Sequence, residues 1–87
     1  MKSLNTINAL LMVNPRGLKG GDHTVFVSGN DKAAKGAVAE LLEAMGWTDI
    51  LDLGDLSTAR GPEMYMAMWL RLSGATGTAF VNVKVVR

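Results

Sequence analysis

The sequence has 87 residues, of which 48% are hydrophobic and 20% are charged, and its net charge is +1. This composition predicts one globular domain over residues 1–87, because disordered chains have fewer large apolar residues and more unbalanced charge. The small net charge argues against a nucleic-acid-binding protein, and the lack of cysteine excludes disulfides and thiolate-bound metals. With neither a signal-peptide pattern nor an apolar run of about 18 residues, the sequence predicts a cytoplasmic protein with no membrane span.

The first thirty residues contain two predicted strands separated by a loop. Residues 2–4 predict the end of a strand, and residues 7–13 are apolar but too few to assign by periodicity. Residues 16–22 include three glycines and predict a loop. The β-branched and aromatic residues of 23–29 then predict a short buried strand that ends on a glycine.

A helix follows, with signals at both of its ends. Asn30 or Asp31 can cap the free amides of the first turn, and Gly46 stands where a C′ glycine would end the helix. Its apolar residues fall on one face: Ala34, Val38, Leu41, Leu42 and Met45. Residues 49–53 predict another strand, so strand, helix and strand form a βαβ unit with parallel strands.

The remainder predicts a second helix, from about Ser57 to Ser73, and a final strand. Two starts are open for this helix: Ser57 as N-cap with Pro62 in the second turn, or Pro62 at the first helical position after a short turn. Apolar and polar residues alternate over Phe80–Val86, which predicts the last strand. The whole pattern is that of an α/β fold.

The sequence contains no complete set of catalytic or metal-binding residues. The glycine loop 17–21 lacks the G-x-G-x-x-G pattern and leads into a strand, so we expect a flexible turn and no phosphate site. His23, the only histidine, is expected to form hydrogen bonds at the surface. Asp49, Asp52 and Asp55 do not converge if they alternate along a strand, and Asp55 fits a turn or cap. We therefore predict no catalytic residue and no metal ligand.

The second helix has unusual patterning. Arg60, Glu63, Ala67 and Arg71 form one narrow stripe, and the residues around it are apolar: Met64, Tyr65, Met66, Met68, Trp69, Leu70 and Leu72. A helix that is hydrophobic on nearly all sides is normally buried on nearly all sides, yet only one other full helix is predicted to cover it. We expect association through a set of five residues: Met64, Tyr65, Met68, Trp69 and Leu72. The alternative is a loosely packed core with some exposed apolar area.

Several segments, in collinear order and covering nearly the whole chain, form a recognisable set: Lys2–Ile7, Val25–Asp31, Asp52–Leu56, Ala59–Gly61, Glu63–Tyr65, Trp69–Leu72 and Asn82–Arg87. Together they resemble one enzyme family, the NADP-dependent oxidoreductases that use the deazaflavin coenzyme F-420. The cytoplasmic reductase domain of the STEAP metalloreductases shares the Asn-Thr-Ile and Ser-Gly-Asn-Asp segments. It is the nearest competing resemblance.

The resemblance implies a partial Rossmann-like, three-layer fold that lacks the N-terminal, dinucleotide-binding half of the family. It also implies NADP and a deazaflavin or flavin as cofactors of the full-length protein, with no hydride transfer by this chain alone. By position in the motif, Asn5, Thr6 and Ile7 would contact the cofactor rings; alternatively, Asn5 and Thr6 only bond their own backbone in a turn. The partner implied is a second copy of the chain or the missing dinucleotide-binding domain.

Overall fold

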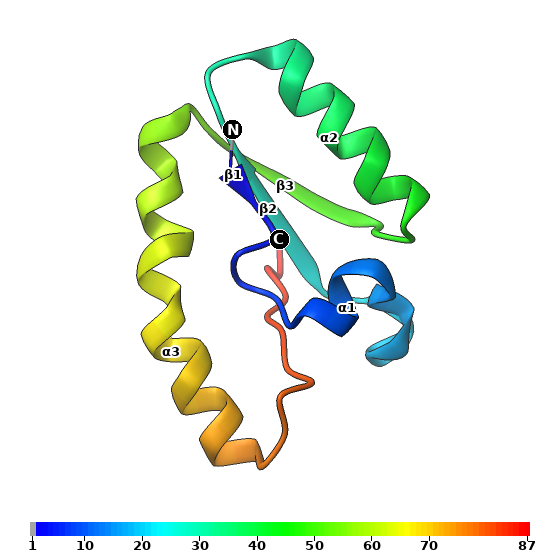
Figure 1. Ribbon diagram of the computed structural model, residues 1–87, viewed down its shortest axis with the longest axis vertical. Helices are drawn as coiled ribbons and strands as arrows, with labels where there is room; N and C mark the ends of the chain where they lie inside the picture. The colour runs from blue at the N-terminus through cyan, green and yellow to red at the C-terminus, as the bar shows by residue number, and fades with distance from the viewer. Residues whose placement is uncertain (1) are drawn as a thin grey trace.

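A three-stranded mixed sheet forms the centre of the fold in the computed structural model, which describes residues 2–87 (Figure 1). The strand order is β1 (Lys2–Ser3), β2 (Thr24–Ser28), β3 (Asp49–Gly54). β2 and β3 are parallel, which confirms the predicted βαβ unit. β1 lies outside this unit and makes the sheet mixed, because it pairs with β2 in the antiparallel sense, Lys2 opposite Ser28. The chain leaves β1 already heading toward the start of β2, so this connection needs no crossover.

The connection from β1 to β2 is a compact helical segment. It contains α1 (Ala9–Val13), within the apolar stretch that periodicity could not assign. Two 3₁₀ turns, Pro15–Gly17 and Lys19–Gly21, follow where the sequence predicts a loop. Leu11 of α1 is 2% exposed. Burial of this side chain anchors the connection to the sheet.

α2 (Lys32–Ala44) connects the two parallel strands and begins and ends where its capping residues predict. The Asp31 carboxylate accepts hydrogen bonds from the backbone amides of Ala33 and Ala34, and Gly46 adopts a φ of 107° just after the helix. Leu42 is fully buried. Leu41, predicted on the same face, is 58% exposed, because the covered stripe is narrower than the sequence suggested.

The hydrophobic core lies on one face of the sheet, between the strands, α1 and α2. Its buried members are Ile7, Leu11, Val25, Val27, Leu42 and Trp47. Trp47 packs edge-on against His23 at 4.9 Å between ring centroids, and its indole N–H donates to the Met12 carbonyl at 3.0 Å. Figure 1 shows α2 and α3 on opposite sides of the strands, so helices flank both faces of the sheet.

α3 (Arg60–Thr76) is preceded by a 3₁₀ turn over Leu56–Ala59, which Asp55 caps. The helix therefore starts between the two predicted positions. Pro62 is its third residue, where a backbone N–H is not needed for the helix, and Gly77 ends it with a φ of 74°.

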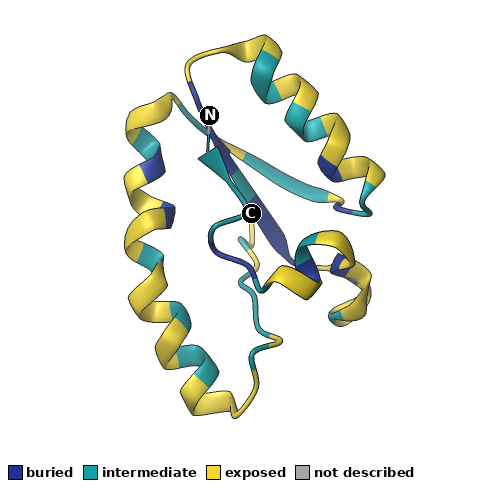
Figure 2. Cartoon of the chain, in the orientation of Figure 1, coloured by how far each residue is buried: buried dark blue, intermediate teal, exposed yellow. Residues whose placement is uncertain are grey.

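Most of α3 is exposed, as the yellow colouring along this helix in Figure 2 shows. Pro62 is its one buried residue. The side of α3 that faces the rest of the chain is half-buried at Tyr65, Trp69 and Leu72. The described chain thus leaves a long helix largely without cover.

The predicted strand over Phe80–Val86 is wrong. This segment runs beside the start of β2 and makes one backbone bond with it, from the Thr24 N–H to the Val83 carbonyl at 2.8 Å. The Thr24 carbonyl is bonded by the Asn82 side chain at 3.0 Å, and the Val85 N–H donates to the Thr24 hydroxyl. Side-chain bonds thus take the place of a regular ladder.

Candidate functional site

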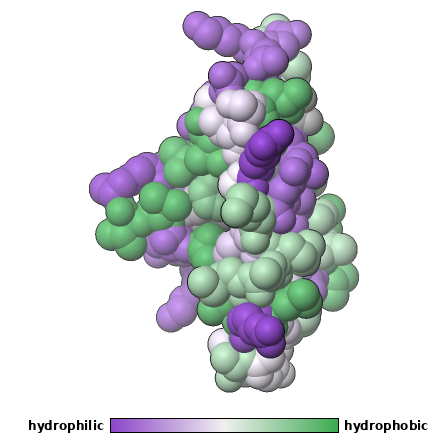
Figure 3. All heavy atoms as spheres, turned by 90° about the vertical axis from the view of Figure 1, so that its left-hand side faces the viewer, coloured by the Kyte–Doolittle hydropathy of each residue, from purple (hydrophilic) through white to green (hydrophobic). Residues whose placement is uncertain are grey.

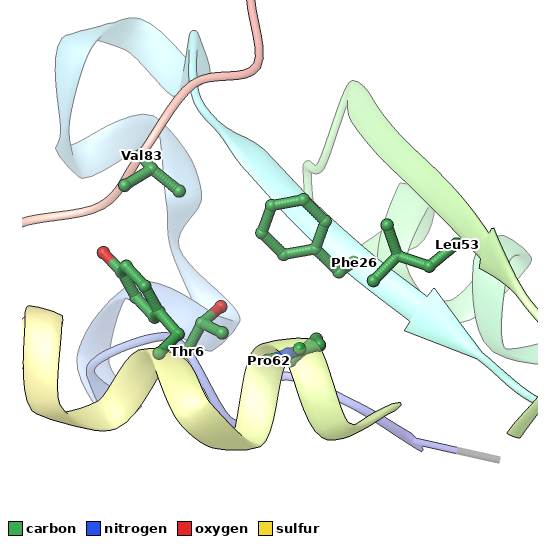
Figure 4. A pocket seen from close by; sticks show the side chains of 7 residues that line it. Thr6, Phe26, Leu53, Pro62 and Val83 are labelled. Atoms are coloured by element: carbon green, nitrogen blue, oxygen red, sulfur yellow. The ribbon is translucent and has the colours of Figure 1, made fainter. Parts of the chain in front are cut away.

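An apolar pocket of about 250 Å³ lies between the sheet, the first turns of α3 and the C-terminal segment (Figure 4). It is on the face of the sheet opposite the main core. The residues that line it come from segments far apart in the sequence: Thr6, Phe26, Leu53, Gly61, Pro62, Tyr65 and Val83. Figure 4 shows Phe26 and Leu53 on neighbouring strands, with Pro62 and Val83 on the other sides of the space.

Strand alternation and one long-range hydrogen bond form this pocket. Val25 and Val27 point into the core, so Phe26 between them points to the opposite face. The Asn5 side-chain amide donates to the Pro62 carbonyl at 2.9 Å. This bond holds the turn after β1 against the start of α3.

The three residues that the resemblance assigned to cofactor contact lie together. Asn5, Thr6 and Ile7 line a groove of about 120 Å³ with Asn8, Met66 and Trp69, and Thr6 lines the larger pocket as well. Asn5 bonds the backbone of α3 and not that of its own turn. Ile7 is 7% exposed and also belongs to the core, so most of its side chain serves packing.

Two hydrogen-bond donors on the inner side of α3 have no partner in the described chain. They are the Tyr65 hydroxyl and the Trp69 indole N–H, and the polar atom of each is inaccessible to solvent. Burial raises the pKa of Tyr65 above its usual value, because the phenolate would lie in an apolar environment. Buried donors without partners are uncommon in folded proteins, and these two residues border the two cavities, Tyr65 the larger pocket and Trp69 the groove.

The residues with ionisable side chains do not form a second site. Asp49 accepts from the Thr24 hydroxyl at 2.5 Å, Asp52 binds Lys35 at 3.0 Å, and Asp55 caps the 3₁₀ turn. These hydrogen bonds, from Thr24 to Asp49, Lys35 to Asp52 and Ser57 to Asp55, are the main cause of a lowered pKa in each carboxylate. Within residues 2–87, no cluster of three or more acidic or histidine side chains could hold a metal.

His23 has a structural position, and the expectation that it lies at the surface is wrong. It is 3% exposed. Its Nε2 lies 2.8 Å from the Pro15 carbonyl oxygen and its Nδ1 lies 2.7 Å from the Asn82 amide nitrogen. Both contacts are satisfied if Nε2 carries the proton. The ring thereby connects the 3₁₀ turns to the C-terminal segment.

Sequence reasoning missed the strand and C-terminal residues of the pocket. Phe26 carried a usable signal, since it alternates with two core valines and must face the other way. Val83 carried none, because its place depends on where the C-terminal segment joins β2. For Pro62, the sequence indicates only a position near the start of the helix.

A known structure matches nearly all of the chain. It is a crystal structure described as a "putative f420 dependent nadp-reductase" from Arthrobacter sp. FB24, with a TM-score of 0.96 and 59% sequence identity over 99% of this chain. The chain is related to the coenzyme F-420-dependent NADP oxidoreductases. The family resemblance predicted from the sequence is thereby confirmed. This chain spans 39% of the length of that relative, consistent with its C-terminal portion.

Other comparisons add no further relative. No protein-family model matches the chain, and no curated protein matches it. The described residues include no helix that is both long and apolar enough to cross a membrane.

Proposed function

We propose that this chain provides the substrate-side portion of an oxidoreductase that transfers hydride between NADP and a deazaflavin or flavin. The observation that carries the proposal is the apolar pocket with the unpartnered Tyr65 hydroxyl, in a chain 59% identical to a protein described as an F-420-dependent NADP-reductase. The dinucleotide-binding portion would be contributed by a further domain. The cofactors themselves supply the hydride chemistry.

The pocket fits one planar ring system better than a whole cofactor. Pockets for drug-sized ligands measure about 300–1,000 Å³, and this one measures about 250 Å³. Its lining is apolar apart from Thr6 and Tyr65 and includes no charged residue. A flavin or deazaflavin ring presents flat apolar faces and carbonyl oxygens, and the Tyr65 hydroxyl can donate to such an oxygen.

The chain's own residues would position the ring and exclude water. Phe26, Leu53 and Pro62 provide apolar contacts on different sides of the pocket. The Asn5 bond to Pro62 fixes the distance between the first turn and α3. Phosphate groups would lie outside this pocket, since nothing in its lining balances their charge.

Ring binding can be tested with a variant that narrows the pocket. Gly61 lines the pocket and a Cβ atom there would meet no heavy atom within 4 Å, so we expect Gly61→Leu to be tolerated by the fold and to narrow the pocket at this wall. Gly36→Leu on α2, also without neighbours within 4 Å, is the matched control. We expect a deazariboflavin titration to quench tryptophan fluorescence in the wild type and the control but not in Gly61→Leu. Equal binding by all three proteins, or none by the wild type, would contradict the proposed site.

Catalysis is tested separately, by NADPH oxidation. With a deazaflavin or flavin acceptor, we expect no turnover by this chain alone. We expect turnover when the chain replaces the corresponding segment of the Arthrobacter relative. Turnover by the isolated chain would overturn the proposal that NADP binding requires a further, dinucleotide-binding domain.

A second candidate function, self-association, is favoured by the exposed side of α3. Met64 is 78% exposed and Met68 is 56% exposed, whereas Tyr65, Trp69 and Leu72 of the predicted set face the chain itself. Exposed apolar patches often mark interaction sites. We expect sedimentation to show a dimer that Met68→Lys dissociates. A soluble monomer at high concentration would count against this function.

A further inference from the structure

The outward side of α3 carries a line of residues spaced three or four apart. Arg60, Glu63, Ala67, Arg71 and Gly74 follow one another along the helix at this spacing, and all five are exposed. At 3.6 residues per turn they form one stripe along the helix axis. Large apolar side chains flank it on both sides: Met64, Met66, Met68 and Leu70, each at least 49% exposed.

Figure 3 shows this side of the molecule, with hydrophobic surface along α3 interrupted by a few hydrophilic patches. The exposed methionines and Leu70 supply large apolar side chains on this side, and the charged residues of α3 are Arg60, Glu63 and Arg71. The charged residues of the stripe therefore decide which orientation a second helix can take.

The charges of the stripe have little compensation within the chain. Glu63 lies 3.7 Å from the Lys2 ammonium, in a pair that is exposed at both ends. Arg71 forms no salt bridge in the described part of the chain, whose ion pairs involve other residues. Glu63 and Arg71 are separated by eight residues, about 12 Å along the helix, which is too far for them to pair on the same helix.

A second copy in the antiparallel orientation brings these charges together. Glu63 and Arg71 each lie four residues from Ala67, so a two-fold axis beside Ala67 places Glu63 opposite the partner's Arg71. The same axis places Arg60 opposite the partner's Gly74, seven residues away on each side, where no side chain obstructs the arginine. In a parallel pair, like charges would face each other instead.

We propose that α3 pairs with α3 of a second copy in an antiparallel arrangement about a two-fold axis at Ala67, with two Glu63–Arg71 ion pairs across the interface. The proposal rests on the self-association described above and gives it a geometry. Ala67 at the axis allows the backbones to approach, while the flanking methionines and Leu70 supply apolar contact. A single helix pair is smaller than the about 800 Å² per partner of a standard interface, so we expect a dimer in the micromolar range.

Charge reversal tests the ion pairs. In Glu63→Arg and Arg71→Glu, both cross-interface pairs become repulsive, and we expect the dissociation constant to rise at least about tenfold. The double variant restores opposite charges and should restore dimerisation. Glu40→Arg, an exposed substitution on α2, is the matched control and should leave the dissociation constant unchanged. Sedimentation of all five proteins at low salt measures the effect, because salt screens exposed pairs.

Cysteine cross-linking tests the orientation, since the chain has no cysteine of its own. Ala67→Cys should form a covalent dimer with itself on mild oxidation. Arg60→Cys should not, because in the proposed pair its two copies are about 21 Å apart along the axis. Mixed Arg60→Cys and Gly74→Cys proteins should cross-link to each other.

The outcomes distinguish the antiparallel pairing of α3 from self-association in any other geometry. A wild type that is monomeric at every concentration overturns both the self-association and the proposed pair. A wild-type dimer in which Arg60→Cys cross-links with itself overturns the antiparallel pair and leaves self-association intact. Cross-linking does not depend on the charge variants, so it decides the question even if one of those fails to fold.

Discussion

Replacing Tyr65 with phenylalanine removes a hydroxyl that is buried as an atom and has no hydrogen-bond partner in the described chain. A buried polar group without a partner costs about 1–3 kcal/mol. Tyr65 as a whole is only half-buried, so we take the lower end. We expect Tyr65→Phe to raise the free energy of unfolding by about 1 kcal/mol, or the melting temperature by about 4–8 °C for a domain of this size.

Urea unfolding followed by tryptophan fluorescence measures this change, because both tryptophans are retained in the variant. Phe26→Tyr is the matched control, since it adds a hydroxyl to the same apolar pocket. We expect it to lower the free energy of unfolding by a similar amount. If Tyr65→Phe is instead less stable than the wild type, the hydroxyl has a partner in the folded chain, and the reasoning about the pocket fails.

The ionisation of Tyr65 gives a second readout of the same burial. Its pKa is raised in the folded chain by burial, so above pH 10 the unfolded chain loses this proton first. The stability contribution is therefore complete below pH 10 and is lost as the pH rises through the folded-state pKa. Above pH 10, the free energy of unfolding of Tyr65→Phe should therefore fall less with rising pH than that of the wild type.

Three further changes test other parts of the fold. Asn82→Ala removes the hydrogen bonds to His23 and the Thr24 carbonyl, and urea unfolding should show a loss of about 1–3 kcal/mol. The pKa of Asp49 is lowered mainly by the Thr24 hydroxyl, so its contribution to stability is present above about pH 4. Unfolding at a series of pH values should show that contribution lost as the pH falls through the folded-state pKa, with a shallower slope in Asp49→Asn. In α2, the Cβ atom added by Gly36→Ala would meet no heavy atom within 4 Å. We expect thermal unfolding to show a free energy of unfolding about 0.5–1 kcal/mol higher than that of the wild type, and a lower value would indicate a contact at this position.

The sequence alone predicted the elements whose signals are local. Asp31 and Gly46 mark the ends of α2 because a capping side chain and a positive φ act within one turn of the helix. The two parallel strands were predicted from runs of five to seven residues for the same reason. The family was also recognisable, because motifs along the whole chain keep their order.

The candidate site was predicted only in part. Asn5 and Thr6 were selected from a motif, and the structure places them beside α3, where their contact with a cofactor remains a prediction. Phe26 and Val83 enter the same pocket from segments 57 residues apart in sequence. No local sequence pattern specifies that these two segments line the same pocket.

Tertiary structure decided how the elements combine. The antiparallel β1, the irregular segment over Phe80–Val86 and the inward side of α3 all depend on partners distant in sequence. Asn82, for example, bonds the carbonyl of Thr24 across 58 residues, and this side-chain bond replaces a backbone bond that a regular strand would make. The sequence by itself therefore determined which segments are helix or strand and the family to which they are related. Which edge and which face they occupy was determined by hydrogen bonds and packing between distant residues, because those energies exist only once the chain has folded.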